Sequence, residues 1–94
     1  MNEQLIHQHL STLDGWRLKQ EQSAIQRDFS FKDFYQTMRF VNALADIAHA
    51  EDHHPELRIG YNYCQVSYTT HSEAGLSEKD FICARQVDAL LNNI

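Results

Sequence analysis

The chain has 94 residues, a formal net charge of −5 and an isoelectric point near 5.6; 43% of its residues are hydrophobic and 22% are charged. This length allows one hydrophobic core, so we expect a single domain over residues 1–94 with the composition of an ordinary globular protein. The eight lysines and arginines are scattered, which argues against direct nucleic-acid binding because no basic stripe is available to neutralise phosphates.

The sequence also argues against a membrane protein. No stretch approaches the roughly 18 apolar residues of a membrane span, and the first residues, MNEQLIHQHL, lack the basic and hydrophobic regions of a secretory signal. We therefore expect a cytoplasmic protein with no membrane partner. Cys64 and Cys83 are too far apart for a C-x-x-C motif, and we expect both to be buried, reduced thiols.

The first part of the chain predicts a helix followed by a hairpin. Apolar residues among polar neighbours over residues 3–10 suit a short amphipathic helix that ends before Asp14-Gly15. An alternating pattern then begins at Trp16, is interrupted by the polar residues 21–23, and resumes over residues 24–29. Two alternating runs around a polar break are typical of a β-hairpin.

A long helix is predicted next. The run from Ser30 to Asp33 has the Ser-x-x-acid form of a capping box. An apolar stripe with helical spacing follows and predicts the buried face of this helix: Phe34, Met38, Val41, Ala45 and Ala48. Pro55 should end the helix, which leaves His53 and His54 at or just beyond its last turn.

The remaining residues predict a second hairpin and a final helix. Residues 57–70 are rich in Ile, Tyr, Val and Thr, with a break near residues 60–63. Ser77 to Asp80 repeats the helix-start pattern, and we expect this list of residues to face the core: Phe81, Ala84, Val87 or Asp88, and Leu91. The resulting order, α-β-β-α-β-β-α, predicts an α+β two-layer domain in which a four-stranded antiparallel sheet carries helices on one face. The other face or an edge strand would then be free to pair with another subunit.

A histidine-rich stretch, H-A-E-D-H-H-P at residues 49–55, is the main candidate for a functional site. His49 and His53 are spaced i, i+4, which suits zinc chelation on a helix. The zinc-protease form H-E-x-x-H is not met, however, because position 50 is alanine. Histidine also titrates near neutral pH, so His53 and His54 at a helix C-terminus beside Asp52 favour proton donation. The remaining alternative is a solvated, purely structural helix end.

Further residues stand at defined spacings from this stretch. The pattern consists of His49, His53-His54-Pro55, Tyr61, His71 and Asp80, and it is accompanied by the short motifs D-G-W, D-H-H-P-E, Y-N, T-H and G-L-S-x-x-D. Together these residues and motifs resemble the pterin-4a-carbinolamine dehydratase family. The resemblance covers nearly the whole chain. Two positions depart from the usual pattern: Leu57 stands where an aromatic residue is common, and His49 stands where an acid is common.

The resemblance implies a hydro-lyase that converts 4a-hydroxytetrahydropterin to quinonoid dihydropterin and water, recycling the pterin cofactor of aromatic amino acid hydroxylases. It implies His53 and His71 as proton donors to the leaving hydroxyl and His54 as the group that binds and polarises the pterin. Asp52, Thr70 and Asp80 are the predicted substrate-binding residues, although Asp80 also fits a capping box. Neither a cofactor nor a metal is expected, since the tetrahydropterin is itself the substrate.

The resemblance also implies a homodimer or homotetramer and a functional link to a pterin-dependent hydroxylase. Two other functions stay open from the sequence. The first is a non-catalytic dimerisation or binding module of the same fold. The second is a metal-binding protein that uses His49, His53 and His71, which would purify with stoichiometric zinc.

Overall fold

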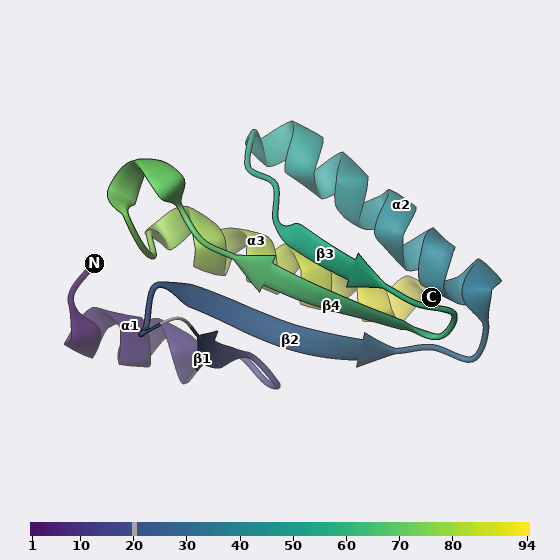
Figure 1. The fold of residues 1–94 in the computed structure, drawn as a ribbon, viewed down its shortest axis with the longest axis horizontal. Coiled ribbons are helices and arrows are strands. Elements are labelled where there is room, and N and C mark those ends of the chain that lie inside the picture. The colour runs from purple at the N-terminus through teal and green to yellow at the C-terminus, as the bar shows by residue number, and fades with distance from the viewer. Residues whose placement is uncertain (20) are drawn as a thin grey trace.

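A computed structural model describes residues 1–19 and 21–94. In chain order these residues form α1 (Glu3–Leu10), β1 (Arg17–Lys19), β2 (Ala24–Ser30), α2 (Phe34–Glu51), β3 (Glu56–Ile59), β4 (Tyr63–Tyr68) and α3 (Glu78–Ala89), with short 3-10 turns at His71–Glu73 and Leu90–Asn93 (Figure 1). The predicted order of helices and strands is therefore confirmed.

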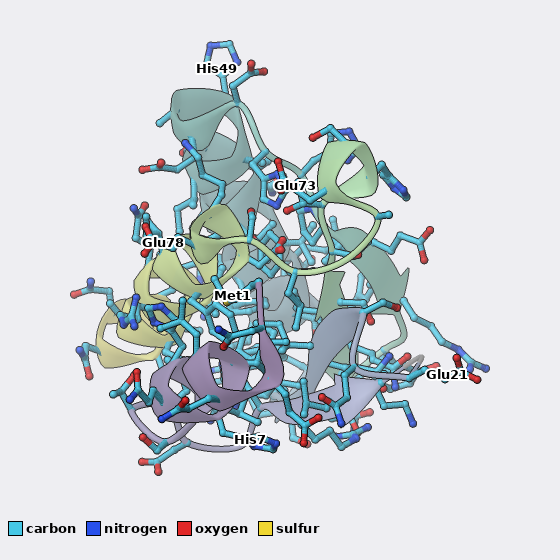
Figure 2. The ribbon with its side chains drawn as sticks, turned by 90° about the vertical axis from the view of Figure 1, so that its left-hand side faces the viewer. Met1, His7, Glu21, His49, Glu73 and Glu78 are labelled. Carbon is cyan, nitrogen blue, oxygen red and sulfur yellow. The ribbon has the colours of Figure 1, made fainter. Side chains whose placement is uncertain are left out.

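The four strands form one antiparallel sheet in the order β1-β2-β4-β3 (Figure 1). Both predicted hairpins are present, because β1 pairs with β2 and β3 pairs with β4, while β2 and β4 form the centre of the sheet. Seen from the end of the sheet, the three helices lie on one side of it (Figure 2). This arrangement is the predicted α+β two-layer fold.

Alternation along the central strands separates the two faces of the sheet. Successive side chains of a strand point to opposite faces, and in β4 Cys64, Val66 and Tyr68 are fully buried while Gln65 and Ser67 between them are partly accessible. The buried side chains pack beneath the helices with Phe40 and Leu44 of α2 and the apolar face of α3. The opposite, polar face of the sheet stays open.

The long helix differs from its prediction at its start. Its N-cap is Asp33, whose Oδ1 accepts a hydrogen bond of 2.8 Å from the Gln36 N–H. The predicted cap, Ser30, is instead the last residue of β2, because its pairing with Tyr63 continues the sheet. The helix-start signal was therefore displaced by three residues, since strand pairing keeps Ser30 extended.

The predicted buried stripe of this helix was only partly correct, since Val41 packs against the core but other members of the stripe do not. The buried residues of α2 are Thr37, Phe40 and Leu44, whereas Phe34 at the start of the predicted stripe is 48% exposed. Thr37 can occupy the core-facing position because its hydroxyl donates to the carbonyls of Asp33 and Tyr61 at 2.9 Å each. Polarity alone therefore placed the buried face of this helix to one side of its actual position.

The final helix matches its prediction more closely. Phe81, Ala84 and Val87 are fully buried, as expected, but Leu91 is 40% exposed because the α-helix ends at Ala89 and a 3-10 turn follows. The predicted burial of Cys64 and Cys83 as free thiols is confirmed. No helix in the described part of the chain is long and apolar enough to cross a membrane.

Candidate active site

The end of α2 sets the positions of the two adjacent histidines. Asp52, the C-cap, adopts a left-handed conformation with φ 50° and ψ 44°, and the N–H of His53 returns to the carbonyl of Ala48 at 3.1 Å. His53 and His54 thus lie in the connection between this cap and β3, beyond the helix as predicted. His53 consequently does not share a helical face with His49.

The side chains of the two neighbouring histidines lie on opposite sides of the sheet. His53 turns toward the helical layer, where its ring stacks on Tyr68 of β4 with centroids 5.7 Å apart and planes inclined by 12°. His54 instead lines a cavity whose other walls include side chains of the open face of the sheet. Opposite directions for successive residues are expected where the chain is extended.

His53 is held by a buried carboxylate at the start of α3. Its Nε2 lies 2.6 Å from Oδ1 of Asp80, whose side chain is fully buried while that of His53 is 15% exposed. The carboxylate accepts hydrogen bonds, so the ring proton on this side belongs to Nε2. Nδ1 is then the nitrogen of His53 that can exchange a proton with a ligand.

The second oxygen of Asp80 is also fully engaged. Its Oδ2 accepts hydrogen bonds from the Thr70 hydroxyl at 2.7 Å and from the Ser77 N–H at 3.0 Å. Ser77 and Asp80 form the predicted capping box. The Ser77 hydroxyl lies 2.8 Å from that of Thr70 and completes the group. Asp80 therefore both caps α3 and orients His53.

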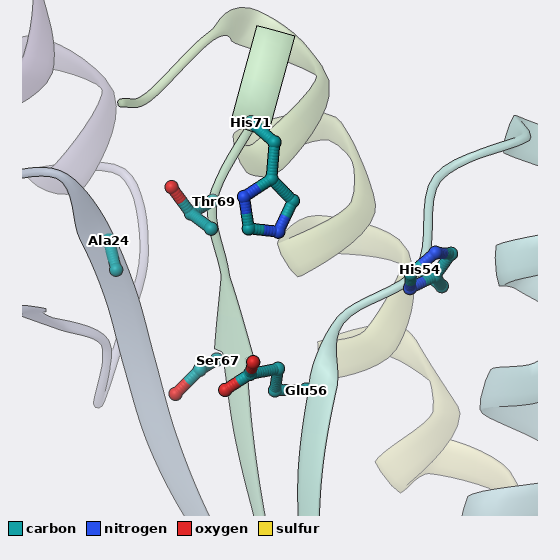
Figure 3. Close-up of a pocket in the computed structure, with 6 residues that line it drawn as sticks. All are labelled: Ala24, His54, Glu56, Ser67, Thr69 and His71. Carbon is teal, nitrogen blue, oxygen red and sulfur yellow. The ribbon is translucent and has the colours of Figure 1, made fainter. Parts of the chain in front are cut away.

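His54 and His71 come together across the sequence at one cavity. This cavity has a volume of about 140 Å³ and is lined by Ala24, His54, Glu56, Ser67, Thr69 and His71 (Figure 3). Figure 3 shows His71 and His54 on either side of the hollow, with Glu56 and Ser67 below them. The cavity is smaller than the roughly 300–1,000 Å³ of a typical ligand pocket, so it would enclose only part of a bicyclic ring.

The other predicted site residues do not line this cavity. Thr70 is partly buried and bonded to Asp80, as described above, whereas Asp52 is exposed at the end of α2. Tyr61 is 65% exposed. His49 lies at the outer end of α2 and projects away from the rest of the molecule (Figure 2).

Burial suppresses ionisation of the groups beneath His53. It raises the pKa of Tyr68 above its ordinary value and raises the pKa of the Cys83 thiol to about 11. Both side chains are fully buried. Tyr68 and Cys83 therefore stay protonated near neutral pH and add no charge beneath the His53 ring.

Sequence reasoning missed four residues that line the cavity: Ala24, Glu56, Ser67 and Thr69. Glu56 was visible as the last letter of D-H-H-P-E, but its direction depends on the register that places it opposite Ser67. The alternation of buried and accessible residues along β4 could have assigned Ser67 to the open face of the sheet. Only the pairing of β2 with β4 brings Ala24 to the same hollow.

The histidines do not form a metal centre with their neighbours. Within residues 1–19 and 21–94, no group of three or more His, Cys, Asp or Glu side chains is arranged to hold a metal ion. His49 is remote, and the Nε2 of His53 is already bonded to Asp80. The described residues therefore do not bring His49, His53 and His71 together as a set of metal ligands.

The described residues form an α+β domain in which two histidines line one cavity and a third is bonded to a buried carboxylate. Comparison with known proteins gives the family. Residues 1–90 match the family described as "Pterin 4 alpha carbinolamine dehydratase", and the chain belongs to this family of hydro-lyases. The resemblance seen in the sequence is thereby confirmed.

Relatives with the same description match most of the chain. A protein of Nitrosospira multiformis is 53% identical over 90 residues, which are 96% of this chain and 78% of that protein. A protein of Nitrosomonas eutropha is 60% identical over 77 residues, 82% of this chain and 66% of its own length. Both carry the description "Putative pterin-4-alpha-carbinolamine dehydratase".

Solved structures show the same fold. The crystal structure of a transcriptional coactivator/pterin dehydratase from Brucella melitensis superimposes with a TM-score of 0.92 at 39% identity and covers 96% of both chains. A pterin dehydratase-like protein described as a RuBisCO assembly factor in the alpha-carboxysome gives a TM-score of 0.71 at 26% identity, over 81% of this chain and 88% of that one.

Proposed function

We propose that this protein dehydrates 4a-hydroxytetrahydropterin to quinonoid dihydropterin and water by histidine acid–base catalysis. The observation that carries the proposal is the convergence of His54 and His71 on one cavity beside His53, which a buried carboxylate orients. Family membership supports the same substrate class.

The reaction asks little of the protein beyond proton transfer. The bond from C4a to the hydroxyl oxygen breaks, and this oxygen takes a proton and leaves as water. N5 gives its proton to a neutral imidazole nitrogen of the histidine site, and the electron pair of the N5–H bond forms the C4a=N5 double bond. One acid and one base near the same edge of the ring therefore suffice, and no metal, cofactor or covalent nucleophile enters the proposal.

The roles follow those implied by the family resemblance. His71, which lines the cavity, is the proposed proton donor to the leaving hydroxyl, and His54 binds and polarises the pterin. The resemblance also makes His53 a donor. Its ring lies on the helical side of the sheet and does not line the cavity, so it can serve the substrate only through the Nδ1 that Asp80 leaves free. Thr70 and Asp80 assist indirectly, because the Thr70 hydroxyl donates a hydrogen bond to Asp80 and Asp80 in turn holds His53. Asp52 is exposed at the helix end and does not line the cavity, so its proposed contact with the substrate lies outside the cavity.

The test is the rate of 4a-hydroxytetrahydropterin loss, followed by ultraviolet absorbance while a hydroxylase generates the substrate. The substrate also dehydrates unaided, so the buffer rate is the reference. We expect wild type to exceed this reference, and His54→Ala and His71→Ala to lose on the order of 100-fold in catalysed rate. Glu78→Gln, at an exposed position of α3 outside the cavity, should match wild type.

Two results would contradict the proposal. If the rate of substrate loss with wild type equals the rate in buffer, the protein does not have the proposed activity. If both histidine variants keep the full wild-type rate, the proposed histidine mechanism is wrong. Circular dichroism spectra of the variants control for folding. Activity that survives prolonged chelation, with no stoichiometric zinc in the protein, is expected from a metal-free mechanism.

A second candidate function is a non-catalytic assembly role, which the similarity to the protein described as a RuBisCO assembly factor favours. Such a role would use exposed surfaces rather than the histidines. Here α2 exposes Phe34 by 48% and Tyr35 by 81%, and these rings offer an apolar contact.

The proposal includes a homodimer or homotetramer that works with a pterin-dependent hydroxylase. Light scattering after size exclusion should give a multiple of 11.0 kDa, reduced in Tyr35→Glu. If the oligomer persists in His71→Ala while activity is lost, catalysis and assembly are separate functions. If no activity is found in any form, the assembly role becomes the better explanation.

A further inference from the structure

The cavity contains a carboxylate to which neither the sequence pattern nor the comparisons give a role. Of the six described residues that line it, Glu56 carries the one carboxyl group. It is the first residue of β3, directly after the histidine stretch, and its side chain is exposed. Figure 3 shows its carboxyl group below the two histidines, on the same side as the Ser67 hydroxyl.

The two aspartates predicted to bind substrate are less suited to direct contact. Asp80 is fully buried, and its oxygens already accept from His53, Thr70 and the Ser77 N–H. Asp52 caps α2 and does not line the cavity. A ligand that needs a carboxylate in this hollow would therefore meet Glu56.

A pterin ring carries hydrogen-bond donors that a carboxylate can bind. Its C2 amino group and its N3–H form two parallel donors on one edge of the ring, and a carboxylate can accept both in a bidentate, charge-assisted pair. We propose that Glu56 receives this amino and amide edge and so orients the ring between His54 and His71. This inference rests on the proposed function and deepens it by assigning the residue that recognises the pterin class.

The neighbourhood of Glu56 supports this role. Glu56 and Ser67 are directly opposed in the β3–β4 register, which places their side chains side by side on the open face. The Ser67 Oγ accepts a hydrogen bond of 2.7 Å from Nε2 of Gln26. Its own O–H is thus left to donate to a ring acceptor beside the edge that Glu56 binds.

A matched pair of stable ligands tests the proposal by equilibrium binding. The ligands are 7,8-dihydropterin and 7,8-dihydrolumazine, which carries a carbonyl in place of the C2 amino group. The carboxylate of Glu56 should prefer the dihydropterin, whereas the amide of Glu56→Gln, with one donor and one acceptor, matches the dihydrolumazine edge. We expect wild type to bind the dihydropterin about tenfold more tightly, and Glu56→Gln to lose about tenfold for it and not for the dihydrolumazine.

Glu73→Gln is the control, because it removes the same charge from an exposed residue near His71 that does not line the cavity. It should bind both ligands as wild type does. An equal loss for both ligands in Glu56→Gln, or no loss, would overturn the role of Glu56 while leaving the proposed function intact. If wild type binds neither ligand, the proposed function fails and this inference fails with it.

Discussion

At the scale of single residues, Asp80 is the group on which the site depends. A fully buried carboxylate that accepts hydrogen bonds from His53, Thr70 and the Ser77 N–H stabilises both a helix end and one tautomer of a histidine. A buried acceptor with satisfied donors also costs free energy when it is altered. Structure and proposed catalysis therefore converge on one side chain.

Replacing Asp80 by Asn should separate these effects. The Thr70 and Ser77 donors require the amide oxygen on their side, so the amide NH₂ faces His53 and forces its proton from Nε2 to Nδ1. We expect on the order of a 100-fold fall in catalysed rate and a stability loss of about 1–3 kcal/mol. Nitrogen-15 NMR of the His53 ring reports the tautomer, which a purely structural role of Asp80 would leave unchanged.

Asp33→Asn is the matched control, because Asp33 also caps a helix through its carboxylate but contacts no histidine. It should retain activity and the His53 tautomer. A wild-type tautomer in Asp80→Asn would show that the carboxylate does not orient the ring.

At the scale of elements, the β3–β4 hairpin fixes the direction of Glu56 and Ser67, and its turn contains a close contact. A Cβ built on Gly60 would lie 2.0 Å from Cε2 of Tyr63, whereas one built on Gly75 would meet nothing closer than 4.0 Å. The ring of Tyr63 thus occupies the space beside Gly60. A side chain there would displace the ring or distort the turn.

Gly60→Ala should consequently lower the free energy of unfolding by about 1–2 kcal/mol. Gly75→Ala should change it by less than about 0.5 kcal/mol, since there is open space around that residue. Urea denaturation of the two variants gives the comparison. Equal stabilities would mean that Tyr63 moves aside without cost.

At the scale of the whole molecule, Asp88 joins the sheet, the N-terminal segment and α3. Its Oδ1 accepts hydrogen bonds from Nη1 of Arg27 on β2 and from the indole N–H of Trp16, each at 2.9 Å. Burial raises the pKa of Asp88, while Trp16 and Arg27 counteract this effect. Folding therefore removes water from part of the Asp88 carboxylate, and the hydrogen bonds from Trp16 and Arg27 compensate for this loss of hydration.

Removing Arg27 should make stability depend more strongly on pH. In Arg27→Met the pKa of Asp88 rises further above its unfolded value, so the folded state binds a proton that the unfolded chain releases. Stability then falls as pH rises from the unfolded pKa through the folded pKa. We expect a loss of about 3 kcal/mol at pH 7 and a smaller loss near pH 4, where the carboxyl is protonated.

Arg17→Met is the corresponding control on the surface. Arg17 pairs with Asp28 at 3.1 Å, but the two side chains are 46% and 56% exposed. Exposed pairs contribute roughly 0–1 kcal/mol, so this variant should change little in denaturant titrations at either pH. An equal loss in both arginine variants would contradict the importance of the buried pair.

Much of the fold follows from local patterns. Alternation and turn residues predicted both hairpins, and Pro55 together with the Ser77–Asp80 signal predicted where one helix ends and another begins. The buried face of α2 could not be obtained in this way, because a hydroxyl such as that of Thr37 counts as polar until its acceptors are known. Ser30 likewise carries a capping signal that strand pairing overrides.

The sequence by itself determined the family and the order of helices and strands, because these depend on residue types and spacing along the chain. Only the tertiary structure decided which partner each side chain meets. Opposite directions at His53 and His54 and the β3–β4 register are three-dimensional properties. They place His53 on Asp80 and bring Glu56 into the cavity with His54 and His71, since contacts between distant residues form only when the sheet and helices pack.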